Sequence, residues 1–133
     1  MRLPRTANLS LMSTQVLALR GAITLERDDR DHLLERVERL LTEMIERNSL
    51  SSDDLISILF TATPDIHSVF PAVAARQMGL GDVPLICAQE LSIVDSMPLC
   101  VRVLMHTNTE LTRSELRHVY LEEARTLRDD LPG

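Results

Sequence analysis

Arg102 is the charged residue of an otherwise apolar run, PLCVRVLM, that spans positions 98–105. The run has the composition of a buried β-strand, and strand alternation places Arg102 on one face with Cys100 and Leu104. A buried guanidinium costs several kcal/mol unless an anion lies beside it. The pattern therefore predicts an anionic partner for Arg102, supplied by the protein or by a ligand.

Further arginines stand in apolar or turn-forming segments. Arg20 ends a strand-like segment, Arg76 follows two alanines, and Arg128 lies near the C-terminus, while Glu90 closes the apolar run LICAQ. For each residue alone, a structural ion pair or a solvated strand end is an adequate explanation. Taken together, guanidinium groups that grip carboxylates indicate a site for a small polyanion, which could catalyse only by positioning and electrostatics.

Other kinds of chemistry lack support in the sequence. No glycine-rich phosphate loop follows a strand, and the four histidines have no metal-ligand spacing to cysteine or carboxylate. No nucleophile occupies a recognisable turn, and Cys87 has no nearby histidine to activate it. We therefore expect neither a metal nor a cofactor.

The 133 residues suit one domain, with 44% hydrophobic and 26% charged residues. A net charge of −6 and the absence of tryptophan argue against nucleic acid or an acidic membrane as partner. No apolar run is long enough to span a bilayer, and the two cysteines lie in apolar segments, as free thiols do. We expect a cytoplasmic protein.

The elements that must position these residues follow from periodicity. Residues 1–14 show none, and we expect a flexible leader there, followed by a single domain over 15–131. The apolar pattern predicts strands at 15–25, 55–62, 83–89 and 99–107 and helices at 28–48 and 71–78. A capping box of Thr112 and Glu115 predicts a third helix, whereas 118–127 fits helix or strand. This order predicts an α+β fold, a mixed sheet with helices on one face.

Five blocks carry a family resemblance. They are LRGAITLERD at 19–28, TATPDIHSVFPA at 61–72, VPLICAQE at 83–90, CVRVLM at 100–105 and RHVYLEEARTLRDDL at 117–131. In order and spacing they resemble the monofunctional AroH-class chorismate mutases, over about residues 16–131. The resemblance implies a chorismate mutase-like, ferredoxin-like sheet, and a homotrimer that forms a pseudo-α/β barrel with active sites between subunits. It also implies a strand at about 119–127 and the rearrangement of chorismate to prephenate in phenylalanine and tyrosine biosynthesis.

The resemblance also implies roles for single residues. Arg102 matches the donor to the ether oxygen whose bond breaks, and Glu90 the carboxylate at the ring hydroxyl, with Cys87 nearby. Arg20 and Tyr120 match residues that hold a substrate carboxylate. The remaining matches line the walls and the mouth of the site: Phe70, Ala72, Val73, Arg76, Leu85, Ile86, Leu127 and Arg128. Many relatives carry lysine where this chain has Val73, so we expect carboxylate binding at the rim to move to Arg76 or Arg128.

Two alternatives remain at this level. An imine deaminase of the Rid type has a similar trimeric fold and an arginine in a cleft between subunits, although the matches at Arg20, Glu90 and Tyr120 argue against it. A non-catalytic binder of an aromatic-pathway acid could use the same pocket, and Val73 is the departure that favours it. Turnover of chorismate distinguishes the three hypotheses.

Overall fold

A mixed sheet is the framework of the computed structural model, which describes residues 14–128. Its strands are β1 (Gln15–Thr24), β2 (Leu55–Ala62), β3 (Leu85–Gln89), β4 (Cys100–Thr109) and β5 (Val119–Leu121), in the order β3-β2-β4-β1-β5. Strand β4 is antiparallel to both β1 and β2, while β3 and β5 run parallel to their neighbours. The expected leader lies, apart from Thr14, outside the described residues, as do residues 129–133.

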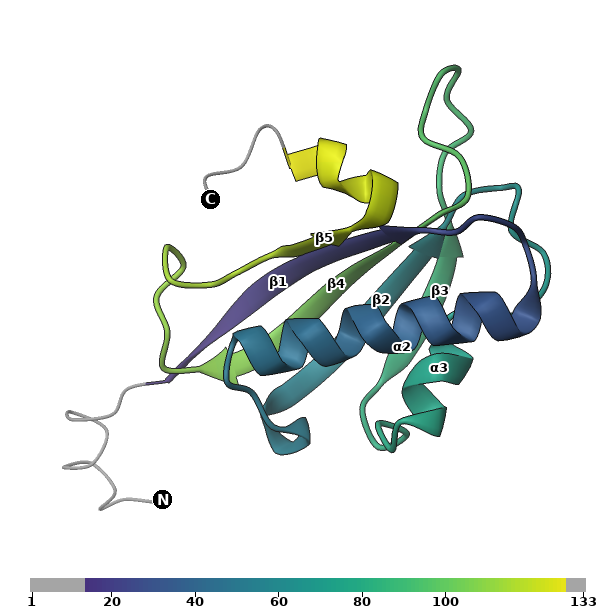
Figure 1. Ribbon diagram of the computed structural model, residues 1–133. Coiled ribbons are helices and arrows are strands. Elements are labelled where there is room, and N and C mark those ends of the chain that lie inside the picture. The colour runs from purple at the N-terminus through teal and green to yellow at the C-terminus, as the bar shows by residue number, and fades with distance from the viewer. Residues whose placement is uncertain (1–13, 129–133) are drawn as a thin grey trace, which may run out of the picture.

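Helix α2 (Arg30–Arg47) covers one face of this sheet, and the short α3 (Ala72–Gln77) lies beside it on the same face (Figure 1). The apolar side chains of α2 recur every three or four residues and are buried. Asp29 caps its first turn by accepting from the backbone N–H of His32, and Asn48 ends it. The helix predicted at 28–48 is confirmed, and it begins at Arg30, two residues later than expected.

The main core lies between these helices and the sheet. Leu19, Leu40, Met44 and Phe60 are fully buried there. Gly21 permits the close approach of α2 to β1, because an added Cβ would stand 2.5 Å from the Sδ atom of Met44. The opposite face of the sheet is called here the open face. Neither α2 nor α3 lies on it (Figure 1).

Two predictions at the C-terminal side are wrong. The capping box forms, since the backbone N–H of Thr112 donates to Glu115 (2.8 Å), but a single turn follows it instead of a helix. The strand expected at about 119–127 ends after Leu121, and a 3-10 helix, η2 (Glu122–Arg128), continues the chain. Another 3-10 turn, η1 (Ser52–Asp54), precedes β2. Tertiary contacts override local propensity at both places: Leu116 is buried, and so is Ala124 of η2.

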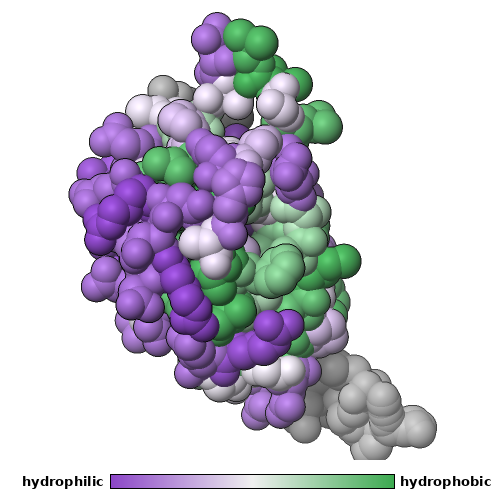
Figure 2. Space-filling model, turned by 90° about the vertical axis from the view of Figure 1, so that its right-hand side faces the viewer, coloured by the Kyte–Doolittle hydropathy of each residue, from purple (hydrophilic) through white to green (hydrophobic). Residues whose placement is uncertain are grey.

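Exposed apolar side chains gather at two places. At the first place, Phe70 just before α3 is 70% exposed and Ile86 on β3 is 63% exposed. At the second, the exposed Leu91 and Val94 lie in the loop between β3 and β4. This loop projects at the top of Figure 1, and Figure 2 shows apolar side chains both at its tip and along the face below it. None of the helices within residues 14–128 has the length and apolar character to cross a membrane.

Candidate active site

A row of residues crosses the open face at the level of Arg102. Strand pairing places Tyr120 of β5 beside Ala22 of β1, Ala22 beside Arg102 of β4, Arg102 beside Thr61 of β2, and Thr61 beside Ala88 of β3. Paired residues on adjacent strands share a face of the sheet. One residue from each of the other four strands therefore lies on the same face of the sheet as Arg102. Cys100 and Leu104 lie on this face too, as strand alternation predicts.

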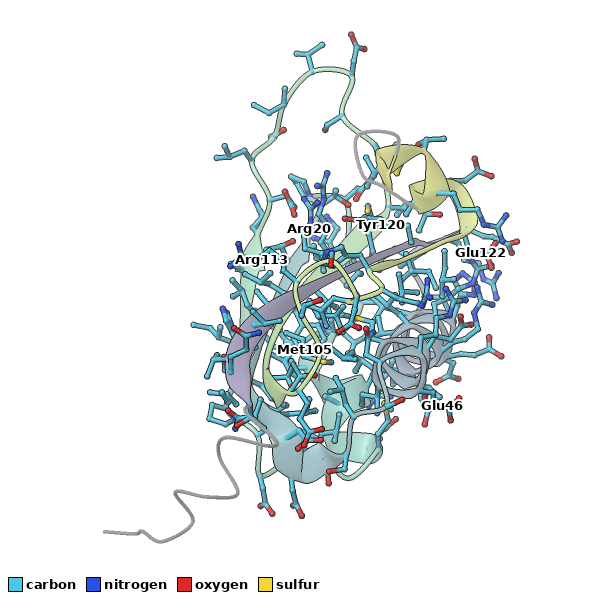
Figure 3. The ribbon with its side chains drawn as sticks, turned by 90° about the vertical axis from the view of Figure 1, so that its left-hand side faces the viewer. Arg20, Glu46, Met105, Arg113, Tyr120 and Glu122 are labelled. Atoms are coloured by element: carbon cyan, nitrogen blue, oxygen red, sulfur yellow. The ribbon has the colours of Figure 1, made fainter. Side chains whose placement is uncertain are left out.

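A small cavity of about 160 Å³ lies along this row. Its lining includes Arg20, Thr61, Arg102 and Tyr120, which come from four different strands. Figure 3 shows the labelled Arg20 and Tyr120 near one another above β1. The sequence predicted that Arg20, Arg102 and Tyr120 belong to one site, and the fold brings these three together.

Glu90 is the carboxylate that contacts Arg102. Its side chain lies 3.4 Å from Nε of Arg102 and accepts a hydrogen bond from the hydroxyl of Thr61. The backbone N–H of Glu90 donates to the carbonyl of Ala62 (2.9 Å), which fixes the end of β3 on β2. One hydrogen bond and one ion pair on this carboxylate hold it in place beside the guanidinium.

Arg102 is more accessible than the apolar run around it suggested. Its side chain is 47% exposed, against 25% for Glu90. The reason is that alternate residues of β4 point to opposite faces. Helices α2 and α3 cover the face with Val101 and Val103, whereas on the open face η2 packs over Cys100 and leaves the Arg102 side chain accessible. The guanidinium therefore combines a protein carboxylate on one side with access for an anionic ligand on the other.

Cys100 forms the apolar floor next to this cluster. It is buried with Ala22, Tyr120 and Ala124, and Leu127 packs against the same group. Burial raises the pKa of the Cys100 thiol to about 11, an effect that the nearby Arg102 guanidinium only partly offsets. The thiol is therefore neutral at physiological pH and acts as a small apolar side chain.

His118 fixes the strand that carries Tyr120. Its Nδ1 accepts a hydrogen bond from the backbone N–H of Arg20 (2.9 Å), which joins the start of β5 to β1. Desolvation lowers the pKa of His118, and the charge of Arg20 lowers it further. Both effects favour the neutral ring, whose unprotonated Nδ1 the hydrogen bond requires.

The other predicted site residues lie elsewhere in the chain. Ala72 is buried on α3, Val73 packs against the core, and Arg76 is exposed one turn later. Phe70 and Cys87 line a separate cavity of about 470 Å³ between the 63–71 segment and β3. Within one chain the structure does not bring this set to Arg102.

Strand alternation explains why Cys87 and Glu90 separate. Cys87 pairs with the buried Phe60 and faces the helices, as does Leu85, whereas Ile86 points to the open face. Glu90 bonds to Thr61 on that open face. Within a single chain Cys87 therefore faces the helices while Glu90 bonds on the open face, and the implied place of Cys87 near the substrate's ring hydroxyl stays a prediction. Arg128 ends η2, and its side chain lies outside the described part of the structure.

Thr61 is a site residue that sequence reasoning missed. It stands in the block TATPD and reads there as a strand end before a turn. The signal was available in principle, because antiparallel pairing of the two apolar strands at a suitable register places a hydroxyl beside Arg102. The register itself depends on the whole sheet and could not be read from either strand alone.

The family, the related sequences and the solved structure that this chain matches are all chorismate mutases. The family described as "Chorismate mutase type I" matches residues 16–131. The chain is 40% identical to chorismate mutase AroH of Bacillus subtilis (strain 168) over 117 residues, which cover 87% of this chain and 92% of that protein. It is 44% identical to chorismate mutase AroH of Thermus thermophilus, again over 117 residues, covering 87% of this chain and 96% of that protein. A solved chorismate mutase from Clostridium thermocellum superposes with a TM-score of 0.82 at 42% identity, covering 83% of this chain and 98% of that one.

Proposed function

The chain belongs to the type I chorismate mutase family and is an isomerase that converts chorismate to prephenate in aromatic amino acid biosynthesis, and we propose that this reaction takes place at the open-face cluster of Arg20, Glu90, Arg102 and Tyr120. The observation that carries the proposal is the Arg102–Glu90 pair beside a cavity lined by Arg20 and Tyr120. The family assignment replaces the imine deaminase and the non-catalytic binder considered above.

The reaction is a unimolecular rearrangement in which a carbon–oxygen bond breaks as a carbon–carbon bond forms. Negative charge builds on the ether oxygen when the first change runs ahead of the second. Arg102, held by Glu90, donates to that oxygen and stabilises the charge more in the transition state than in the ground state. One such contact contributes about 3–4 kcal/mol to lowering the barrier.

The remaining residues restrain the substrate. Arg20 and Tyr120 bind a substrate carboxylate, and Glu90 accepts from the ring hydroxyl on the side away from Arg102. Holding the flexible side chain of chorismate in its compact, reactive conformer removes a further part of the barrier. A rearrangement of this kind transfers no proton to the protein and forms no covalent intermediate, so the cluster of charges suffices.

A second copy of the chain completes the site in this proposal. The wall residues Phe70, Ala72, Val73, Leu85 and Cys87 lie away from Arg102 in one chain, and Phe70 is 70% exposed. The open face also carries exposed apolar side chains, among them Ile86 and Val16. Three copies that meet through their open faces would cover this surface and place the Phe70 wall of one copy over the Arg102 pocket of the next.

Mixing two inactive variants tests the shared site. Arg102→Ala and Phe70→Asp each remove one side, and Phe70 is exposed enough to be replaced without loss of the core. After unfolding and refolding together, random trimers should have both sides intact in about a quarter of their sites and regain that share of activity. Mixtures that stay as inactive as their parents, or a particle of single-chain mass in solution, would argue against the shared site.

We also propose that the protein is located in the cytoplasm. The two cysteines, Cys87 and Cys100, are unpaired. Free thiols persist in a reducing environment, which supports a cytoplasmic location.

A further inference from the structure

Glu122, the residue directly after β5, has an unusual backbone conformation. Its φ angle is 58°, in the left-handed region that side chains other than glycine rarely adopt. Such a conformation persists only where the surrounding structure enforces it, and it marks positions at which the chain must turn sharply. Here the chain leaves the sheet edge and enters η2.

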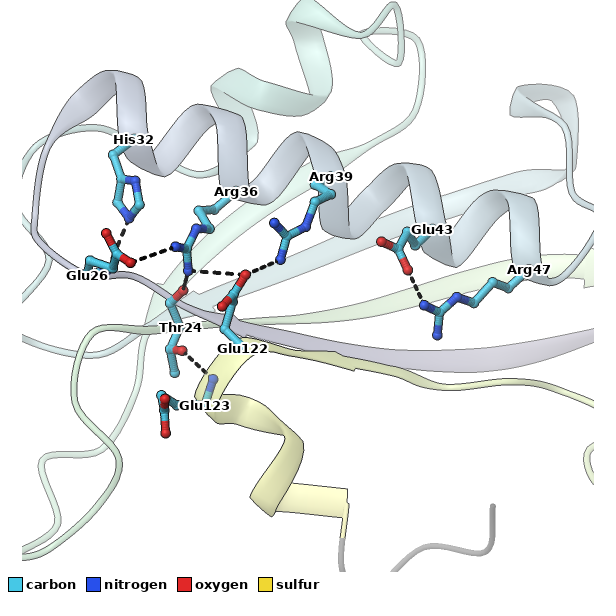
Figure 4. A network of polar contacts seen from close by, with 9 residues as sticks. All are labelled: Thr24, Glu26, His32, Arg36, Arg39, Glu43, Arg47, Glu122 and Glu123. Atoms are coloured by element: carbon cyan, nitrogen blue, oxygen red, sulfur yellow. Dashed lines mark hydrogen bonds and ion pairs between the residues drawn. The ribbon is translucent and has the colours of Figure 1, made fainter.

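Two arginines of α2 hold this residue. Nη2 of Arg39 donates to the Glu122 carboxylate, and Nη1 of Arg36 lies 3.7 Å from the same oxygen (Figure 4). The Arg36 side chain is only 12% exposed. The hydrogen bond from Arg39 is the largest influence on the carboxyl of Glu122 and, with the nearby arginine charges, lowers its pKa.

The same arginine ties in the end of β1. Nη1 of Arg36 donates to the carbonyl of Thr24 (2.8 Å), and the Thr24 hydroxyl accepts from the backbone N–H of Glu123 (3.0 Å) (Figure 4). Arg36 also lies 3.4 Å from Glu26. One corner of the molecule thus joins α2, β1 and the start of η2.

Tyr120 depends on this corner for its position. Strand β5 has three residues, lies at the edge of the sheet and pairs with β1. Its entrance is fixed by Asn48, which bonds both backbone groups of Arg117 (2.8 and 3.0 Å), and by His118. Its exit is fixed by Glu122.

We propose that Glu122, held by Arg36 and Arg39, is a positioning residue that sets Tyr120 and the first turn of η2 for substrate binding. The inference rests on the proposed role of Tyr120 at the open face. The Glu122 carboxylate contacts α2 and not the cavity at Arg102. Its effect on substrate binding therefore passes along two residues of β5. Arg102 stands on β4 and Glu90 directly follows β3, and their contribution to the chemical step stays intact when Glu122 is changed.

Arg39→Gln is the principal test, because the chain offers a matched control. Arg47 on the same helix forms a comparable ion pair with Glu43: the side chains are 46% and 29% exposed, against 45% and 33% for Arg39 and Glu122. We expect Arg39→Gln and Glu122→Gln to raise KM for chorismate about fivefold to twentyfold, with kcat changed less than about threefold. Arg47→Gln should leave KM within about twofold of the unmodified chain.

Glu122→Gly distinguishes positioning from stability. Glycine accepts a positive φ without strain, so this variant should melt at or above the temperature of Glu122→Gln. A purely structural role predicts that KM recovers together with stability. A positioning role predicts that KM stays as high as in Glu122→Gln, because the link to Arg36 and Arg39 is still missing.

A Tyr120→Phe background completes the experiment. If Glu122 acts through Tyr120, the KM of the double variant Glu122→Gln/Tyr120→Phe should match that of Tyr120→Phe alone within about twofold. Full additivity, or values for Arg39→Gln indistinguishable from those of Arg47→Gln, would overturn the inference. Failure of the proposed site is a separate result, namely an Arg102→Ala variant that still turns over chorismate at the normal rate.

Discussion

Replacement of Thr61 by valine probes how the carboxylate of Glu90 is held beside Arg102. Valine keeps the shape and the strand preference of threonine but removes the hydroxyl that donates to Glu90. Within residues 14–128, the Glu90 carboxylate then keeps the Arg102 guanidinium at 3.4 Å as its charged partner. With fewer restraints the carboxylate and the guanidinium both sample orientations that do not match the substrate.

The size of the effect follows from exposure. A hydrogen bond to a charged group contributes about 1.5–3 kcal/mol when buried. Glu90 is a quarter exposed, so water replaces part of the lost donor. We therefore expect a loss of about 1 kcal/mol in transition-state stabilisation, or about fivefold in kcat/KM, seen mainly in kcat.

The assay is the initial rate of chorismate consumption, followed by its ultraviolet absorbance. Thr61→Ser keeps a hydroxyl and should return kcat to within about twofold of the unmodified chain. Ser57→Ala is the control, since Ser57 lies on the same strand face but its hydroxyl contacts His106 (3.1 Å). Unchanged kinetics in Thr61→Val, or an equal loss in Ser57→Ala, would refute the role given to Thr61.

Three further predictions concern the supporting structure. Gly21→Ala should destabilise the fold by about 1–3 kcal/mol in denaturant unfolding, because its Cβ would stand 2.5 Å from Sδ of Met44; an unchanged midpoint would contradict the packing. The lowered pKa of His118, caused first by burial, means that the unfolded chain takes up this proton more readily. His118 therefore adds stability above pH 6.5, its ordinary pKa, and this contribution is lost as pH falls below it; His118→Gln should flatten the slope of stability against pH in this window. With its pKa raised to about 11, only about a thousandth of Cys100 is thiolate at pH 8, so a Cys87→Ser chain should resist iodoacetamide until it is unfolded, and rapid labelling of the folded chain would show that the thiol is more acidic.

Periodicity alone located most of the framework. The helix at 28–48 and the strand at 55–62 are confirmed because their apolar spacing repeats over enough residues to be unambiguous. The region after Thr112 was predicted less well, since a strand of three residues carries almost no pattern. Its course depends on distant partners such as Asn48 and Arg36.

The site was predictable where it follows from strand alternation. The face of Arg102 and its contact with a carboxylate could be anticipated, and Glu90 is that carboxylate. Thr61 could not, because its place beside Arg102 depends on the register between β2 and β4. Nor could the exposure of Arg102, since a sequence does not show which face of a sheet the helices leave uncovered.

The kinetics of Arg102→Ala show whether this guanidinium lowers the barrier of the rearrangement. If Arg102 stabilises the charge that develops on the ether oxygen, kcat for chorismate should fall by about 10²–10³-fold, while KM changes far less. The variant should keep its fold, because the side chain is 47% exposed, and its melting temperature checks this. A folded Arg102→Ala protein whose kcat stays within about threefold of the unmodified chain would contradict the account.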